Sequence, residues 1–318
     1  MRTFPLPSIH GRLTSGSSTP ATAWRLGLAA GCAALLAGCA GQAIQQAEAP
    51  GCLDAVAVAA LTSAYEARIP ADNPPVNLSP AAAACSRAKF QAETARLTGP
   101  LVGYKAGLTN PAVQKRFHTD QPVWGSLGKA MLLTSPAQVP AQFGARPVFE
   151  ADLLVRVKDA RINQASTPEQ VLASVDQIVP FIELPDLMVQ KPTDLNGNAL
   201  TAINVGARLG VTGAPLAVPA EPQAQATLVR QLADMRVHLR DQHGKSLAEG
   251  KGADVLGNPL QAVVWLAGAL KAEGRSLQPG QYVSLGSFSP LLPPKAGLQV
   301  NVHYEGVPGL AAAQVSFR

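Results

Sequence analysis

The chain has 318 residues, of which 47% are hydrophobic and 15% charged, with 28 glycines and 27 prolines. This composition excludes a disordered chain, which would be rich in charge and poor in apolar residues, and the prolines exclude a coiled coil. Setting aside the three arginines of the first 38 residues leaves 23 of the 26 Lys and Arg against 21 Asp and Glu, so the net charge falls from +5 to +2. We therefore expect no nucleic-acid partner. No apolar stretch reaches the roughly 18 residues that span a bilayer, so we expect no transmembrane helix.

Residues 1–38 resemble a bacterial lipoprotein signal peptide. Arg2, Arg12 and Arg25 precede an uncharged apolar run, Leu26–Gly38, whose 13 residues suit a signal-peptide core and are too short to cross a bilayer. The run ends in Leu-Ala-Gly directly before Cys39, the arrangement in which a peptidase cuts before the cysteine and lipid is attached to its thiol. The alternative is an ordinary secretory signal with an incidental cysteine.

Lipid at Cys39 predicts a protein anchored in the cell envelope. Each buried CH₂ of an acyl chain contributes about 0.8 kcal/mol, so several chains give a stable anchor. Ala40 is not Asp, which favours the outer membrane of a Gram-negative cell, on its periplasmic side. Residues 39–52 are then expected to form a tether.

Cysteine usage agrees with export. Cys32 leaves with the signal and Cys39 takes lipid, so Cys52 and Cys85 remain as a pair. Disulfides persist in oxidising compartments, and we predict one between these two residues. The alternative is two buried free thiols, which are common in protein cores.

Residues 53–100 predict an N-terminal helical segment. Leu53–Ile69 carries apolar residues at helical spacing. A second helix is expected over Pro80–Thr98, because Ser79 is a good N-cap, Pro80 suits the first helical position and Gly99 suits the end.

Residues 101–318 predict one mixed domain. Helices are expected from Thr167-Pro168 to about Gln177 and from Asn258-Pro259 to Gly274, and the run Asp241–Lys245 predicts a hairpin turn. Strands outnumber helices and their alternation is irregular, so we expect an α+β fold with a mixed sheet that is rolled or barrel-like. The predicted strands are Leu101–Ala106, Phe149–Val157, Val179–Leu184, Met235–Arg240, Tyr282–Leu285, Leu298–Tyr304 and Ala313–Phe317.

Glu150 and Asp152 are the most informative local feature. On a strand, residues two apart share a face, so these acids point the same way, about 7 Å apart. Like charges so placed on an apolar strand repel unless a cation or a proton lies between them. Glu183 is likewise isolated in an apolar run. Oxygen ligands suit Mg²⁺, Mn²⁺ or Ca²⁺; the alternative is a half-exposed strand whose acids face solvent.

From Val102 to the C-terminus the sequence resembles the fumarylacetoacetate hydrolase superfamily, in the branch of the 2-keto-4-pentenoate hydratases and 4-oxalocrotonate decarboxylases. The resemblance implies the mixed, barrel-like catalytic domain of that superfamily. Several segments carry it together, in family order and at family spacing. They are Gly103–Phe117, Asp120–Leu127, Phe149–Val155, Val179–Asp186, Glu249–Ala267 and Ser284–Gly297.

The resemblance implies a set of site residues. A divalent metal, Mg²⁺ or Mn²⁺, would bind a 2-oxo acid substrate and stabilise its enolate as a Lewis acid. In the family the metal is held by an E-x-E pair and a later Glu, and a Lys and an Asp carry the proton. The corresponding residues are Glu150, Asp152 and Glu183 for the metal, Lys105 and Asp120 for catalysis, and Asn204, Gly286 and Ser287 for substrate binding.

Two departures from the family pattern bear on function. The metal pair is E-x-D, with the shorter Asp152, and the segment that reads A-D-N-A-S in the hydratases reads A-I-N-V-G here, with Ile203 and Gly206. The second departure removes an acid and a hydroxyl that the family uses near the site, so it bears on substrate choice and water delivery and favours a non-catalytic role. From the retained Glu150, Asp152, Glu183, Lys105 and Asp120 we nevertheless expect a hydratase acting on a 2-oxo-4-enoate or 2-hydroxydienoate such as 2-keto-4-pentenoate. The alternatives are a 2-oxo acid decarboxylase, an acylpyruvate C–C hydrolase, and a non-catalytic, ligand-binding surface lipoprotein. Homo-oligomers are usual in the family and are expected here.

Overall fold

The computed structural model describes residues 48–318. The expected signal peptide, the lipidation site Cys39 and most of the tether lie outside the described residues. No helix within residues 48–318 is both long and apolar enough to cross a membrane.

The N-terminal helical segment consists of α1 (Ala55–Ala67) and α2 (Pro80–Thr98), close to the predicted bounds. Ser79 caps α2 as expected, its hydroxyl accepting a hydrogen bond from the backbone N–H of Ala82 at 3.1 Å. A disulfide joins Cys52 and Cys85 and so ties the chain before α1 to α2.

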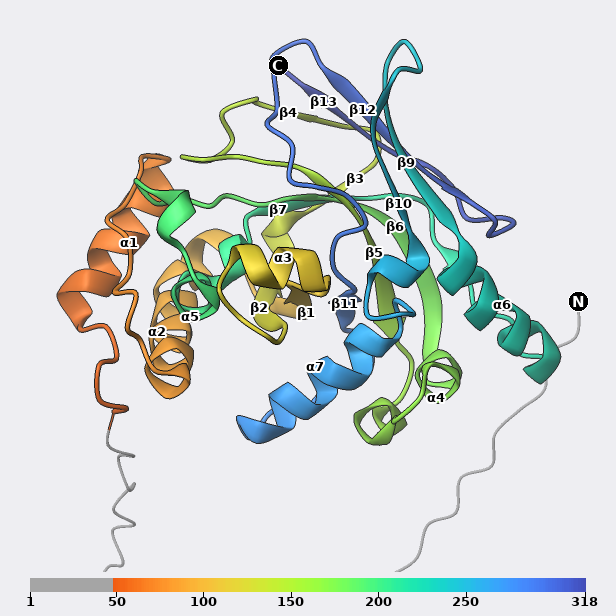
Figure 1. Ribbon diagram of the computed structural model, residues 1–318, viewed down its shortest axis with the longest axis horizontal. Helices are drawn as coiled ribbons and strands as arrows, with labels where there is room; N and C mark the ends of the chain where they lie inside the picture. Colours follow the sequence, from red (N-terminus) through yellow and green to blue (C-terminus); the bar gives the residue numbers. More distant parts are fainter. Residues whose placement is uncertain (1–47) are drawn as a thin grey trace, which may run out of the picture. The chain divides into compact units, whose positions relative to one another are not determined.

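Two β-sheets form the body of the protein (Figure 1). The larger sheet has eight strands of mixed direction and curls around the core, which confirms the predicted α+β fold with a rolled mixed sheet. Its strand order is β2 (Val123–Gly128), β1 (Leu101–Gly107), β11 (Tyr282–Ser284), β5 (Glu150–Val157), β6 (Val175–Leu184), β7 (Leu209–Thr212) and β3 (Leu132–Thr134), with β8 (Leu216–Ala217) paired to β6.

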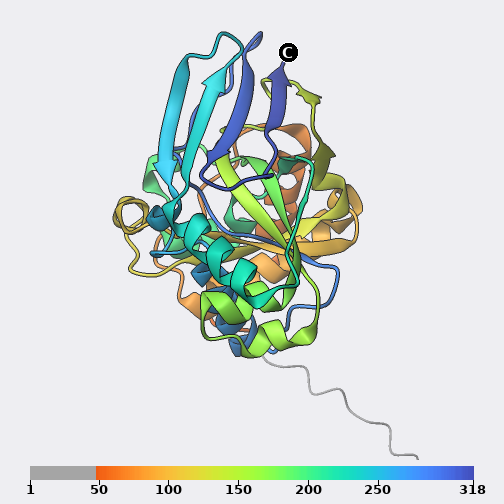
Figure 2. The same ribbon diagram turned by 90° about the vertical axis from the view of Figure 1, so that its right-hand side faces the viewer.

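The smaller sheet has five strands and stands beside the larger one, as the turned view shows (Figure 2). Its order is β10 (Ser246–Lys251), β9 (Arg236–Asp241), β12 (Gln299–Glu305), β13 (Ala313–Phe317) and β4 (Ala137–Val139). The turn at Asp241–Lys245 joins β9 to β10 as predicted: the Asp241 carboxylate accepts hydrogen bonds from the backbone N–H groups of His243 and Lys245.

The hydrophobic core explains why β5 and β6 are buried along almost their whole length. Leu153, Val155 and Ile182 belong to one large cluster, which side chains of β12, β13 and α7 (Gln261–Ala272) complete. Tyr304 of β12 reaches across to the larger sheet, where its hydroxyl donates to the backbone carbonyl of Asp152 at 2.5 Å. The smaller sheet therefore supports the strands that carry the acidic residues from behind.

Some predicted elements were wrong or missing. The helix expected over residues 167–177 is the short α4 (Pro168–Ala173), because Val175 already begins β6 and is buried in the core. The sequence pattern did not predict α6 (Pro222–Asp234), which buries Leu228, Val229 and Leu232. It also missed the short helices α3 (Pro111–Arg116) and α5 (Gly197–Ala202) and the strands β2, β3, β4, β7, β8 and β10.

Candidate active site

The three acidic residues are buried on two neighbouring strands, β5 and β6. Glu150 begins β5, and in the antiparallel pairing of β5 with β6 it stands directly opposite Glu183, while Asp152 stands opposite Phe181. Glu150 is 9% exposed, Asp152 0% and Glu183 2%. The alternative that these acids face solvent from a half-exposed strand is therefore wrong.

Lys105 of β1 is the cation of this site. It is 3% exposed, and its Nζ forms an ion pair with Glu183 Oε1. Its Nζ also donates a hydrogen bond to the backbone carbonyl of Val205 at 3.1 Å. Two of the three ammonium donors thus hold Lys105 in place beside the carboxylates.

Asp152 is held by hydrogen-bond donors from its own strand, from the end of β11 and from the two residues after β11. The Ser284 hydroxyl donates to Oδ2. Oδ1 accepts from the backbone N–H groups of Leu153 at 2.6 Å, Gly286 at 3.0 Å and Leu285 at 3.2 Å. Because Asp is one methylene shorter than Glu, its carboxylate stays close to its own strand, within reach of these donors.

The site holds three acidic side chains and a single buried cation, so burial and mutual repulsion act on the pKa values of the carboxyl groups. Burial, and next the charge of Glu183, raises the pKa of Glu150 well above its ordinary value. The same two causes raise the pKa of Asp152 from 3.8 to about 8. Lys105 lowers both pKa values, but its single charge does not offset three buried carboxyl groups.

The donor set fits a hard divalent cation in its chemistry. Three buried carboxyl groups offer the oxygen ligands that Mg²⁺ and Mn²⁺ prefer, and burial and repulsion raise the pKa values of two of them, Glu150 and Asp152. In the arrangement that the structure shows, Glu183 is paired with Lys105 and Asp152 with Ser284, and no cluster of three or more possible ligands within residues 48–318 is already shaped around an ion.

A left-handed turn supplies the carbonyl that holds Lys105. Asn204, Val205 and Gly206 have φ of 55°, 55° and 63°, and a β-branched residue such as Val205 is rarely found there. Gly107 and Gly125 make room for the turn: a Cβ on Gly107 would lie 2.7 Å from Val205 Cγ1, and one on Gly125 would lie 2.5 Å from the Asn204 carbonyl oxygen.

The amide of Asn204 fastens this turn to β2. Its Oδ1 accepts hydrogen bonds from the backbone N–H of Ser126 and from Gln91 Nε2, both at 2.8 Å. Its Nδ2 donates to the backbone carbonyl of Ser126 at 3.1 Å. These bonds occupy the side chain, so Asn204 supports the turn and does not line the cavity.

A cavity of about 150 Å³ opens beside Lys105 and Glu150. Its polar lining residues are Lys105, Thr109, Asn110, Arg116, Glu150, Ser287 and Ser289. Its walls are largely apolar and come from the β1–α3 segment, from α5 and from the segment after β11. The apolar wall residues are Leu108, Val113, Phe117, Pro185, Leu187, Leu200, Val205, Pro290 and Leu291.

Of the other predicted site residues, Ser287 and Gly286 lie at the site and Asp120 does not. Ser287 lines the cavity, and its hydroxyl donates to the backbone carbonyl of Ser289 at 2.6 Å. Gly286, with φ of 100°, presents its N–H to Asp152. Asp120 lies in the bend between α3 and β2, exposed and outside the cavity lining. Its proposed catalytic role therefore has no geometric support here.

Two groups that shape the site were not predicted from the sequence. Ser284 could have been found, because a hydroxyl residue in the apolar run of β11 needs a hydrogen-bond partner when it is buried, and it is fully buried. The Val205 carbonyl carries none, because a backbone atom becomes functional only through the conformation of the turn.

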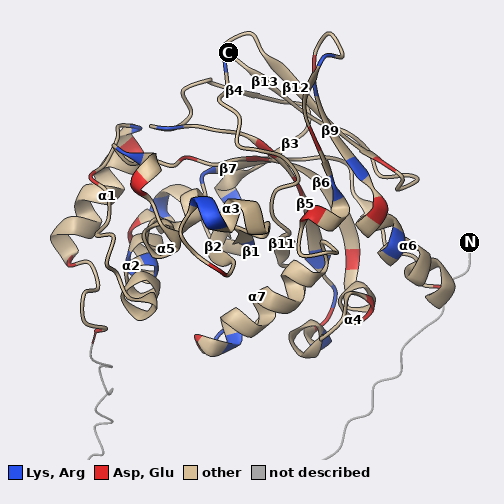
Figure 3. Cartoon of the chain, viewed as in Figure 1, with Lys and Arg blue, Asp and Glu red and all other residues tan. Residues whose placement is uncertain are grey.

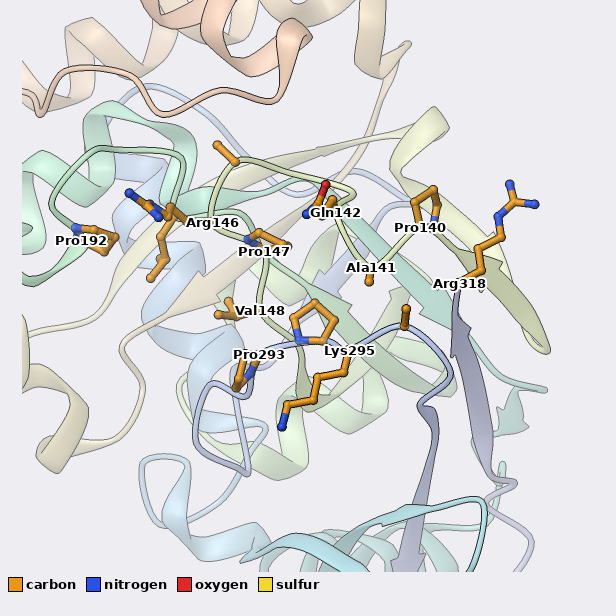
Figure 4. Close-up of a pocket in the computed structure, with 14 residues that line it drawn as sticks. Pro140, Ala141, Gln142, Arg146, Pro147, Val148, Pro192, Pro293, Lys295 and Arg318 are labelled. Atoms are coloured by element: carbon orange, nitrogen blue, oxygen red, sulfur yellow. The ribbon is translucent and has the colours of Figure 1, made fainter.

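A larger surface hollow of about 860 Å³ lies elsewhere, between the segment 140–148 and the segment 293–296. Figure 4 shows that its three cationic side chains, Arg146, Lys295 and Arg318, point in different directions. It contains none of the predicted site residues. Charged residues of both signs are scattered over the remaining elements (Figure 3). The buried carboxyl groups beside the small cavity therefore mark the candidate active site.

Comparison with known proteins agrees with this geometry. No family model matches the chain. A 2-keto-4-pentenoate hydratase of Paraburkholderia xenovorans and 2-keto-4-pentenoate hydratase 3 of Pseudomonas putida are each 30% identical over 208 residues, which cover 65% of this chain and 73% of either relative. The chain belongs to the 2-keto-4-pentenoate hydratase branch of the fumarylacetoacetate hydrolase superfamily. It is therefore an enzyme of the hydro-lyase type, and the non-catalytic alternative loses its support.

Solved structures confirm the fold of this hydratase branch. The 4-oxalocrotonate decarboxylase from Pseudomonas putida G7, complexed with magnesium and adipate, superposes with a TM-score of 0.70 over 84% of this chain and 99% of that chain, at 21% identity. The same decarboxylase complexed with calcium and acetate gives 0.69 at 20% identity, with the same coverage.

Proposed function

We propose that the protein hydrates a 2-hydroxydienoate such as 2-hydroxypenta-2,4-dienoate, the enol of 2-keto-4-pentenoate, to 4-hydroxy-2-oxopentanoate. One observation carries the proposal: Lys105 and Glu150 line a small, largely apolar cavity, and Lys105 is paired there with the buried Glu183. Such a cavity suits an acid with a short hydrocarbon tail. The names of the 30% identical relatives support the same substrate class.

The reaction needs a proton carrier beside the carbon chain. A proton leaves the 2-hydroxyl and one arrives at C5, which gives the 2-oxo-3-enoate; then the oxygen of water bonds to C4 and a proton of water reaches C3. Lys105 is placed to hold and pass these protons at Nζ, because its ion pair with Glu183 keeps it at the cavity. The apolar walls exclude bulk water from the intermediate.

We propose that Glu150, Asp152 and Glu183 hold a divalent cation, Mg²⁺ or Mn²⁺. Bound there, it would supply Lewis-acid polarisation of the 2-oxo group. The raised pKa values of Glu150 and Asp152 support a missing positive charge at this point, as does the magnesium of the decarboxylase that shares the fold.

The test is direct. Purified protein with Mg²⁺ is expected to bleach the ultraviolet absorbance of 2-hydroxypenta-2,4-dienoate, and NMR is expected to show 4-hydroxy-2-oxopentanoate. Glu150→Gln, or removal of the metal with EDTA, is expected to abolish the reaction. Activity that survives both would refute the metal's role, and the absence of any turnover of the dienoate would refute the hydratase function.

A decarboxylase is the second candidate, because the fold is shared with a 4-oxalocrotonate decarboxylase. Its substrate class, a 2-oxo-3-enedioate, would release CO₂. The same NMR assay separates the candidates, since a hydratase adds a hydroxyl at C4, a decarboxylase shortens the acid by one carbon, and an acylpyruvate hydrolase yields pyruvate.

We also propose that the protein is exported and lipid-anchored at Cys39 on the periplasmic side of the outer membrane. The Cys52–Cys85 disulfide supports export, because disulfides persist in oxidising compartments. Mass spectrometry of the mature N-terminus is expected to find acyl chains on Cys39, and Cys39→Ser is expected to release the protein from membrane fractions. A homo-oligomer is proposed from the family alone, and light scattering of the purified protein tests it.

A further inference from the structure

Thr109 is a buried polar residue of the cavity to which neither the sequence nor the mechanism above gives a role. It follows β1 by two residues, is 2% exposed and lines the cavity together with Lys105 and Ser287. Its side chain packs against Gly286: a Cβ placed on Gly286 would lie 2.1 Å from Thr109 Oγ1. The Thr109 hydroxyl therefore lies where the β1 segment meets the segment that follows β11.

The Thr109 hydroxyl forms none of the side-chain hydrogen bonds within residues 48–318, although buried hydroxyl groups normally find a partner. It is not one of the fully enclosed unpaired atoms of those residues, so its oxygen keeps some accessible surface at the cavity that Thr109 lines. Other buried threonines follow that rule. Thr94 donates to the carbonyl of Phe90 at 2.7 Å, and Thr201 donates to the carbonyl of Gly197 at 2.8 Å. Thr62 also lacks a partner, but it lies in α1 and does not line the cavity. An unpaired hydroxyl at a cavity wall indicates a partner that arrives with the ligand.

We propose that the Thr109 hydroxyl donates a hydrogen bond to the carboxylate of the bound 2-oxo acid and so fixes the substrate's polar end. The inference rests on the proposed function, since it takes a 2-oxo acid as the ligand. Thr109 is then a substrate-contacting residue.

The chemistry of the cavity favours the carboxylate over the tail. The carboxylate is expected beside Lys105, Thr109 and Ser287, because most of the remaining lining is apolar and Arg116, the other cation of the lining, is exposed. A hydroxyl can donate a hydrogen bond to the substrate carboxylate without adding charge to the site. Lys105 already directs two of its three donors to Glu183 and to the Val205 carbonyl. A hydrogen bond to a carboxylate is charge-assisted and stronger than one between neutral groups.

Pyruvate is the probe, because it contains the 2-oxo acid end and no tail. Its affinity in the presence of Mg²⁺ is measured by titration calorimetry on the wild type, Thr109→Val and Thr109→Ser. Valine has the shape of threonine and keeps the packing against Gly286, so the variant removes only the hydroxyl. Loss of a hydrogen bond to a charged group corresponds to at least about a 10-fold loss of affinity. Serine keeps the hydroxyl and is expected to restore the affinity to within about threefold of wild type.

The matched control is Thr94→Val, which removes a buried hydroxyl away from the cavity and is expected to leave pyruvate affinity unchanged. Melting temperatures of all variants check that the fold is intact. Wild-type affinity in Thr109→Val would overturn the inference, as would a loss seen only with the longer dienoate, which would place Thr109 at the tail. If the wild type itself binds no 2-oxo acid, the proposed function fails instead.

Discussion

Asp152→Asn tests the electrostatics of the site in the metal-free protein. Burial, and next the charge of Glu183, raises the pKa of Asp152 from 3.8 to about 8. Between about pH 4 and pH 8 the folded protein therefore holds a proton that the unfolded chain has released. A group whose pKa is raised in this way makes the folded state less stable as pH rises through that window. At about 1.4 kcal/mol per pH unit, the loss between pH 5 and pH 8 is roughly 4 kcal/mol.

Asparagine keeps the hydrogen bonds and removes the titration. Its carbonyl oxygen can accept from Leu153 and Gly286, as Oδ1 of Asp152 does, and its amide can donate to the Ser284 hydroxyl. Free energies of unfolding in urea with EDTA are measured at pH 5 and pH 8. The wild type is expected to lose several kcal/mol more than Asp152→Asn over this range, and the variant is expected to be the more stable protein at pH 8.

Asp159→Asn is the control for that measurement. Its hydrogen bonds to Arg161 lower the pKa of Asp159 to about 2, so its contribution is lost only as pH falls below about 4. Between pH 5 and pH 8 it is expected to follow the wild type. Parallel pH dependence of the wild type and Asp152→Asn would refute the assignment of a raised pKa to Asp152.

Three other substitutions have defined outcomes. Lys105→Met leaves Glu183 buried without its cation, so we expect a loss of about 3–5 kcal/mol in denaturant unfolding and at least about a 100-fold lower kcat; retained turnover would contradict Lys105 as proton carrier. Replacing Cys52 and Cys85 by serine opens a link across a sequence separation of 33 and is expected to cost about 3–4 kcal/mol, which an unchanged urea midpoint would disprove. Gly286→Ala places a Cβ 2.1 Å from Thr109 Oγ1 at φ of 100°, so pyruvate binding is expected to weaken about 10-fold or more. The control is Gly257→Ala, which also has a positive φ but has no atom near its new Cβ, and it is expected to bind pyruvate normally.

Much of the fold follows from local signals that tertiary contacts do not override. Ser79, Pro80 and Gly99 define α2 because caps and proline act within a few residues of themselves. The short strands β2, β3 and β7 were missed because their stability comes from neighbours far away in the chain, as in the pairing of Leu132–Thr134 with Gly210–Thr212. The same competition ends α4 early, where Val175 gains more from the core than from another helical turn.

In the candidate site, too, local pattern predicts some features and distant contacts decide the others. The shared face of Glu150 and Asp152 comes from the period of a strand and was predictable, and so was the isolation of Glu183 in an apolar run. The bond of Lys105 to the Val205 carbonyl depends on a turn one hundred positions further along the chain. The occupied amide of Asn204 and the exposure of Asp120 likewise depend on how distant segments pack, which residue type alone does not reveal.

A crystal structure of the protein grown with Mn²⁺ and oxalate tests the central claim most directly, because anomalous scattering locates the metal without assumption. The account predicts a single strong anomalous peak among the carboxylates of Glu150, Asp152 and Glu183, with oxalate completing its coordination. A peak elsewhere, or none at these three side chains in a protein that turns over the dienoate, would contradict it.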